Sequence, residues 1–206
     1  MLKELIPATR ITLVLALLTG LAFPLLITGA AQVLFPEQAN GSLIRNGKGT
    51  VIGSKLLAQK FETPKYFHPR PSAAGSGYAG EASGGTNLGP TSSKLIMGVA
   101  DDPATKADES FSGIKQLAEN YRKENGLAEN AAVPVDAVTR SASGLDPDIS
   151  EANALIQAPR IARARGVKED VIVDLIHKCK SERDLQIFGE PRINVLTINL
   201  ALDNSK

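Results

Sequence analysis

Two histidines, His68 and His177, are the side chains in this sequence that could act as the base of a serine hydrolase. Ser83 or Ser143 with His68 is the pairing such an enzyme would use. However, the G-x-S-x-G turn that exposes the nucleophile in one large class of hydrolases occurs nowhere in the chain. His177 and Cys179 stand two residues apart on a predicted helix, hence on different faces, so we do not expect them to share a metal ion. We therefore keep hydrolysis only as the alternative to a non-catalytic role.

Oxygen-bearing side chains cluster at Asp146, Asp148, Ser150 and Glu151 and could coordinate a hard cation. The glycine and the distal glutamate of a calcium-binding loop are missing from this stretch. Ser150 can instead cap a helix that starts after it, and Asp148 can complement that helix's dipole. Capping is the simpler interpretation, and we predict no metal site.

Three further stretches could meet anions. Gly84-Gly85-Thr86-Asn87 could offer a concave row of backbone donors, although no basic residue stands beside it. The stretch from Asn46 to Thr50 resembles a phosphate loop, but it has Ser42 and Gly49 where the motif needs Gly and Ser or Thr. A basic cluster near the end of a predicted helix could offset the helix dipole or contact an anionic partner or lipid. Its members are Arg160, Arg163 and Arg165.

An uncharged stretch from Ile11 to Pro36 decides on which side of a membrane all these residues lie. At about 1.5 Å per residue, a helix over residues 11–35 is long enough to cross a hydrocarbon core of about 30 Å. A cleaved signal peptide is the other interpretation, but its apolar part would be only about 7–15 residues long. Lys3 and Arg10 outweigh Glu4 before the stretch, so we expect residues 1–10 to form a cytoplasmic tail.

The remaining residues, 36–206, then form one extracytoplasmic domain. Subtracting Lys3, Arg10 and Glu4 from 23 basic and 22 acidic residues leaves 21 of each, so nucleic acid is not an expected partner. The single cysteine, Cys179, excludes an intramolecular disulfide. The sequence thus predicts a single transmembrane helix plus one α+β (mixed α/β) extracytoplasmic domain, held by its core.

Local patterns predict the elements of that domain. Two Asn-Gly turns and the strand-like residues 50–53 predict a hairpin, followed by a short helix capped by Ser54. Four prolines and six glycines make residues 64–90 a long loop, which we expect to be ordered and to bind something. Further predictions are a helix at 107–125 with Asp108 and Glu109 in its first turn, a strand at 133–139 and a helix at 150–165 that Gly166 ends. We also predict a helix at 168–180 and either a strand or an Asn194-capped helix at 193–202.

Several motifs together resemble one family, the C subunit of the Kdp high-affinity potassium-transporting P-type ATPase. The resemblance runs in order through nearly the whole chain. Its motifs are Leu34-Phe35-Pro36, Gln38-Ala39-Asn40-Gly41-Ser42-Leu43, Tyr66-Phe67-x-Pro69-Arg70-Pro71-Ser72-Ala73, Ala82 to Pro90, Val133 to Thr139, Ser141 to Ser150, Gln157 to Gly166 and Gly189 to Leu196.

The resemblance implies a non-catalytic accessory subunit of an ATP-driven potassium uptake pump in the bacterial inner (plasma) membrane. Its partners would be a channel-like potassium-translocating subunit, an ATP-hydrolysing P-type subunit and membrane lipid. The complex would use ATP, Mg and K+, with no cofactor held by this chain alone. The family is also credited with raising the pump's affinity for ATP, although an extracytoplasmic domain would not meet cytoplasmic ATP.

We take small or kinking residues of the membrane helix and polar residues of these motifs as candidate partner contacts. They are Gly20, Pro24, Arg70, Asn87, Asp146, Gln157, Arg160 and Arg163. The alternative function is a membrane-anchored extracytoplasmic hydrolase that uses Ser143 or Ser83 with His68.

Overall fold

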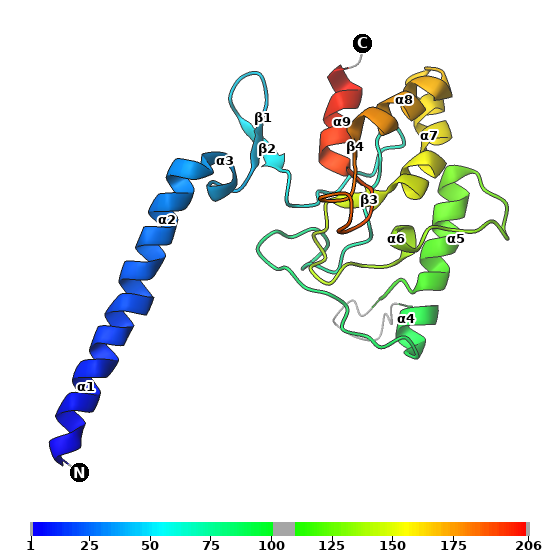
Figure 1. Cartoon of the computed structure of the whole chain (residues 1–206). Helices are drawn as coiled ribbons and strands as arrows, with labels where there is room; N and C mark the ends of the chain where they lie inside the picture. The colour runs from blue at the N-terminus through cyan, green and yellow to red at the C-terminus, as the bar shows by residue number, and fades with distance from the viewer. Residues whose placement is uncertain (1, 101–109, 205–206) are drawn as a thin grey trace. The chain divides into compact units, whose positions relative to one another are not determined.

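The computed structural model describes residues 2–100 and 110–204 (Figure 1). The chain divides into two compact units, of which the first ends at Ser54 and the second begins at Lys55. The predicted first-turn residues Asp108 and Glu109 of the 107–125 helix lie outside the described residues. The second unit mixes helices and short strands, as predicted.

The first unit is mostly one long helix. It runs through α1 (Leu2–Leu17), the π-helical turn η1 (Leu18–Ala22) and α2 (Phe23–Leu34). The stretch Lys3–Leu34 is long and apolar enough to cross a membrane. Pro24 has no N–H and its ring crowds the carbonyl four residues earlier, so the widened turn just before it is its local consequence.

A hairpin follows the helix, as the Asn-Gly turns predicted. After α3 (Pro36–Ala39), strand β1 (Leu43–Arg45) pairs antiparallel with β2 (Val51–Ser54). The Asn46 side chain closes the turn by accepting hydrogen bonds from the N–H groups of Lys48 and Thr50 at 3.0 and 2.9 Å.

The short helix predicted after Ser54 is absent, and residues 55–61 form turns and irregular chain instead. The buried Ser54 side chain does not cap a helix, because its hydroxyl donates to the carbonyl of Gly41 at 2.7 Å. The N–H of Ala58 donates to the carbonyl of Leu145 at 2.9 Å. Long-range hydrogen bonds therefore replace the local ones that a helix would need.

Residues 64–90 contain no helix or strand, as predicted from their prolines and glycines. The chain then forms α4 (Ser93–Met97), with the Ser92 hydroxyl capping the N–H of Leu95. Helix α5 (Ile114–Asn125) begins later than predicted, because Phe111 pairs with Val99 in an isolated bridge and the Gln116 side chain caps the N–H of Gly113. Its apolar residues are half-buried.

The strand predicted at 133–139 is wrong, since Val135–Val138 forms the single helical turn α6. Valine favours strands only weakly, and tertiary contacts override that preference. Here Asp136 accepts hydrogen bonds from the Ser150 N–H and hydroxyl at 2.8 and 2.9 Å, which holds the turn against the next elements.

The second half of the domain carries most regular structure. Strand β3 (Asp148–Ser150) leads into α7 (Glu151–Arg165), α8 (Glu169–Cys179), β4 (Lys180–Ser181), β5 (Arg192–Asn194) and α9 (Val195–Asn204). The strands pair antiparallel in the order β3-β5-β4. Ser150 caps α7 and Gly166 ends it with a φ of 67°, both as predicted. The segment 193–202 contains both predicted forms: residues 193 and 194 are the end of strand β5, and the Asn194 side chain then caps helix α9.

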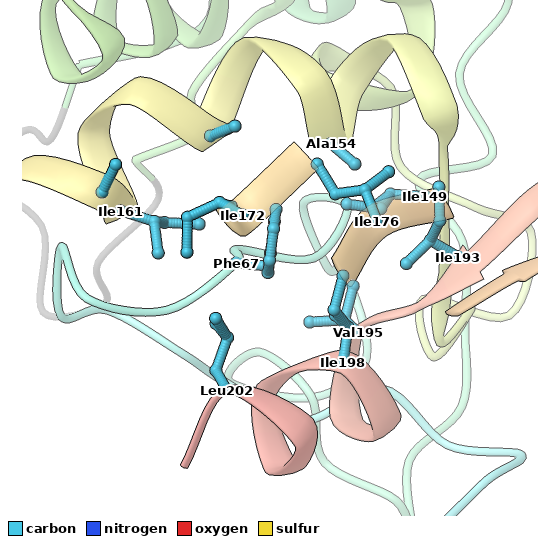
Figure 2. Packing of buried hydrophobic residues seen from close by; sticks show 12 residues of the cluster. Phe67, Ile149, Ala154, Ile161, Ile172, Ile176, Ile193, Val195, Ile198 and Leu202 are labelled. Atoms are coloured by element: carbon cyan, nitrogen blue, oxygen red, sulfur yellow. The ribbon is translucent and has the colours of Figure 1, made fainter. Parts of the chain in front are cut away.

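The core lies between α7, α8, α9 and the paired strands β3 and β5 (Figure 2). Ile149 and Ile193 face each other across the strand pair and are buried. Phe67, from the 64–90 loop, is fully buried and lies amid the helix side chains. A loop without regular structure therefore supplies a central core residue, which fixes the loop to the domain.

Candidate functional site

A buried polar network on α7 holds the start of the 64–90 loop. The Arg160 side chain is only 5% exposed. Its guanidinium donates to the carbonyls of Pro64 and Tyr66 at 2.7 and 3.1 Å, and to the side-chain oxygens of Asn125 and Gln157 at 3.1 and 2.7 Å. Burial lowers its pKa, against the opposing charge of a nearby glutamate. One side chain thus ties α7 to α5 and to the loop.

Gln157 and Asn199 continue this attachment. Gln157 is 1% exposed, accepts from the N–H of His68 at 2.7 Å and donates to its carbonyl at 3.1 Å. Asn199 of α9 does the same for Phe67, at 2.8 and 2.9 Å. The N–H and carbonyl groups of Phe67 and His68 are therefore both hydrogen-bonded, as they would be in a β-strand.

A second anchor joins the loop to the 139–146 segment. Arg70 donates to the Asp146 carboxylate at 2.7 Å and to the carbonyl of Thr139 at 3.2 and 3.3 Å. The other Asp146 carboxylate oxygen accepts from the N–H of Asp148 at 3.0 Å. Both oxygens are thus used inside the fold. The carboxyl of Asp148 has a raised pKa, because burial and the neighbouring Asp146 charge disfavour its ionised form.

A pocket of about 370 Å³ opens between this loop and α5. The His68 ring is in its wall, and its Nδ1 lies 2.7 Å from the Glu124 carboxylate. Burial alone would raise the pKa of Glu124, but the hydrogen bond and charge of His68 and the charge of Arg160 lower it. Burial raises the pKa of Tyr78, also in the wall, to about 12. Near neutral pH Glu124 is therefore ionised and Tyr78 is neutral.

The hydrolase residues are not assembled. The two ring nitrogens of His68 lie 2.7 Å from Glu124 and 3.0 Å from the carbonyl of Thr63. The Ser83 hydroxyl donates to the carbonyl of Ser143 at 3.0 Å, and the Ser143 hydroxyl accepts from the N–H of Leu145 at 3.1 Å. Neither serine is bonded to the histidine, so these residues serve the fold of the loops.

The glycines before Asn87 provide a close approach between two loops. The N–H of Gly84 donates to the carbonyl of Ser143, and a Cβ on Gly85 would lie 2.9 Å from the carbonyl oxygen of Ala142. The Gly84 amide is therefore used within the protein and is not presented to an anion. Asn87 is exposed, with a φ of 52°.

The three arginines of the basic cluster lie in three different environments. Arg160 is buried, whereas Arg165 pairs with Asp203 at 2.8 Å and lies 5.1 Å from the centre of the Tyr66 ring. Arg163 is exposed. His177 pairs with Glu151 at 3.3 Å, while Cys179 packs at the edge of the core. Within residues 2–100 and 110–204 no group of three or more His, Cys, Asp or Glu side chains could hold a metal ion.

The fold thus brings Gln157 and Arg160 into one network and Arg70 and Asp146 into another, whereas Asn87 and Arg163 remain at the surface. Gly20 and Pro24 lie at the widened turn of the long helix in the first unit. Sequence reasoning missed the network partners Glu124, Asn125 and Asn199. It also missed Asn153, which accepts from Gln157 and donates to Asp136, each at 2.9 Å. One signal was available: Asn153, Gln157 and Arg160 repeat at helical spacing on what proves to be the buried face of α7.

Comparison with known proteins agrees with the resemblance in the sequence. The family model "KdpC: K+-transporting ATPase, c chain" matches residues 5–204. A "Potassium-transporting ATPase KdpC subunit" from Rhodospirillum rubrum is 53% identical over 203 residues, covering 98% of this chain and 96% of the relative. Proteins of the same name from Caulobacter vibrioides and Mycobacterium tuberculosis are 48% and 46% identical, covering 98% of this chain and 94% and 99% of the relatives. The chain therefore belongs to the KdpC family, as an accessory subunit of the Kdp potassium-transporting ATPase.

Proposed function

We propose that this subunit stabilises the pump from the extracytoplasmic side. Its helix packs against the channel-like potassium-translocating subunit, and its domain caps or stabilises the path by which potassium enters. The N-terminus is cytoplasmic, because Lys3 and Arg10 outweigh Glu4 there. The subunit assembles with the channel-like and ATP-hydrolysing subunits and catalyses no step itself.

The observation that carries this proposal is the fixed 64–90 loop. Phe67 fills the core, and Gln157, Arg160 and Asn199 pair the main chain of residues 64–68. A long loop held this firmly offers a preformed surface, and binding to a preformed surface loses little conformational freedom. The reactive side chains near it are engaged in the fold, which favours a binding role over hydrolysis.

Assembly is tested by purifying the pump with and without this chain. We expect the pump core that lacks the chain to dissociate in detergent or to lose high-affinity potassium transport. A core that stays intact, with unchanged potassium affinity and coupled ATP hydrolysis, would refute the proposal. His68→Ala separates the alternative, because a hydrolase that uses this base would lose its activity whereas an assembly subunit would retain pump activity.

Orientation is tested with a matched pair of single cysteines. Cys179 itself is a poor probe, because it packs at the core edge and burial raises the pKa of its thiol. In a Cys179→Ser background, we expect Leu185→Cys, at a position where the native side chain is 82% exposed, to react with a membrane-impermeant reagent in spheroplasts. Lys3→Cys should react only after the cells are opened. The reverse pattern would place the domain in the cytoplasm.

The same orientation bears on the affinity for ATP. An extracytoplasmic domain would influence the nucleotide only through the pump's membrane subunits, not by touching it. Photolabelling of the intact pump with an ATP analogue distinguishes these routes. We expect label on the ATP-hydrolysing subunit and none on this chain.

A further inference from the structure

The widened turn in the membrane helix leaves main-chain carbonyls without donors. The N–H of Phe23 bonds to the carbonyl of Leu18, five residues back, so it no longer serves Thr19 as it would in an α-helix. Residue 24 is proline, so Gly20 has lost its α-helical donor as well.

The register resumes with α2, which starts at Phe23, so regular α-helical geometry pairs the N–H of residue 26 with the carbonyl of residue 22. Leu25 then has the one N–H that remains for three carbonyls, those of residues 19, 20 and 21. Within the described helix, residues 2–34, at least two of these carbonyls therefore have no main-chain donor.

The neighbouring side chains do not repair this deficit. The Thr19 hydroxyl donates backwards, to the carbonyl of Leu15 at 2.7 Å. Gly20 has no side chain, and a Cβ built there would meet nothing within 4 Å. The carbonyls are thus open to whatever lies beside this face of the helix.

The turn also lies deep in the apolar stretch. Gly20 is ten residues beyond Arg10, or about 15 Å along the helix, and is farther still from Glu37. In hydrocarbon an unpaired main-chain polar group costs several kcal/mol, so lipid tails are an unfavourable neighbour here. A polar donor at this depth has to come from protein.

We propose that the turn Leu18–Ala22, with Pro24, is the docking site for a transmembrane helix of the pump that carries a hydrogen-bond-donor side chain, such as serine, threonine, asparagine or glutamine. The open space at Gly20 lets the two helices approach closely. This inference rests on the proposed membrane packing and names the contact that provides it.

Two substitutions test the contact in the complete pump. Pro24→Ala restores the missing N–H and thereby leaves one carbonyl fewer open to a partner. Gly20→Leu leaves the carbonyls as they are but blocks the approach of a helix. Gly29→Leu is the control, because Gly29 lies in the same helix outside the widened turn and also has open space around it.

The readout is the amount of this chain that co-purifies with a tagged ATP-hydrolysing subunit as the detergent-solubilised pump is diluted. An interhelical hydrogen bond in a membrane corresponds to a change of about 3- to 30-fold in the association constant. We expect a loss of that size for Pro24→Ala and at least as much for Gly20→Leu, with Gly29→Leu at the wild-type level.

Wild-type association of both test variants, or an equal loss in the Gly29 control, would overturn the inference. Deleting the whole chain distinguishes this failure from failure of the proposed function. If the deletion disrupts the pump while both point variants bind normally, then the subunit stabilises the pump through other contacts.

Discussion

Replacing Arg160 by methionine separates its role in the fold from a role at a partner surface. Methionine keeps an apolar stem of similar length but provides none of the donors. The carbonyls of Pro64 and Tyr66, which accept from Arg160 at 2.7 and 3.1 Å, would then lose this donor in a partly buried site. Each such group costs about 1–3 kcal/mol, and removing one partner of a buried ionic cluster costs about 3–5 kcal/mol.

We therefore expect Arg160→Met to lower the free energy of unfolding by about 3–5 kcal/mol, a large part of the ~5–15 kcal/mol that holds a typical domain. With a urea slope of about 2 kcal/mol/M, the midpoint should fall by about 2 M. The assay is urea unfolding of the full chain in mild detergent, followed by tyrosine near-ultraviolet circular dichroism.

Arg163→Met is the matched control, because Arg163 is exposed on the same helix. Its unfolding free energy should stay within about 0.5 kcal/mol of wild type. If Arg163 contacts a partner, that variant should be stable but should bind the pump less tightly. An Arg160→Met midpoint equal to wild type would refute the structural role that we assign to the network.

Three further predictions concern the same domain. Gly144→Ala should destabilise it by more than about 2 kcal/mol in the same urea assay, because φ is +67° and the new Cβ would lie 2.5 Å from a backbone carbonyl oxygen. Gly166→Ala is the control: its φ is also +67°, but a Cβ there lies in open space, so it should cost only about 1 kcal/mol. Glu124 has a lowered folded pKa, so its stabilisation is present above pH 4.5 and is lost as pH falls below that value; Glu124→Gln should flatten this acid limb of the stability curve. Asn199→Leu should cost about 2–4 kcal/mol and speed amide exchange at Phe67, because both main-chain groups of that buried residue lose their partners.

The elements that local chemistry determines were the predictable ones. Ser150 and Gly166 bound α7 as predicted, because a capping hydroxyl and a left-handed glycine act on residues within one turn. The apolar run of the membrane helix is equally local. The family motifs marked Gln157 and Arg160 as candidate partner contacts, and did not indicate that both side chains are bonded within the fold.

What failed required partners far away in the sequence. The turn at Val135–Val138 depends on the hydrogen bond from Ser150 to Asp136. The Ser54 hydroxyl donates to the Gly41 carbonyl instead of capping a helix. The polar network could be suspected from the polar residues repeated along α7, but its acceptors are main-chain carbonyls in a loop about 90 residues earlier. No local pattern encodes such pairings, so their geometry emerged only from the fold.

The bond between Phe67 and Asn199 joins residues 132 positions apart, and this sets the order of events during synthesis. The loop leaves the ribosome long before α9 exists, so the main-chain groups of Phe67 have no Asn199 to pair with until that helix is made. At about 5–20 residues per second, the interval is roughly 7–26 s. Contacts so distant in sequence also slow folding itself. The core of the nascent domain therefore stays incomplete until α9 is made, and a truncation that removes α9 should prevent the domain from maturing.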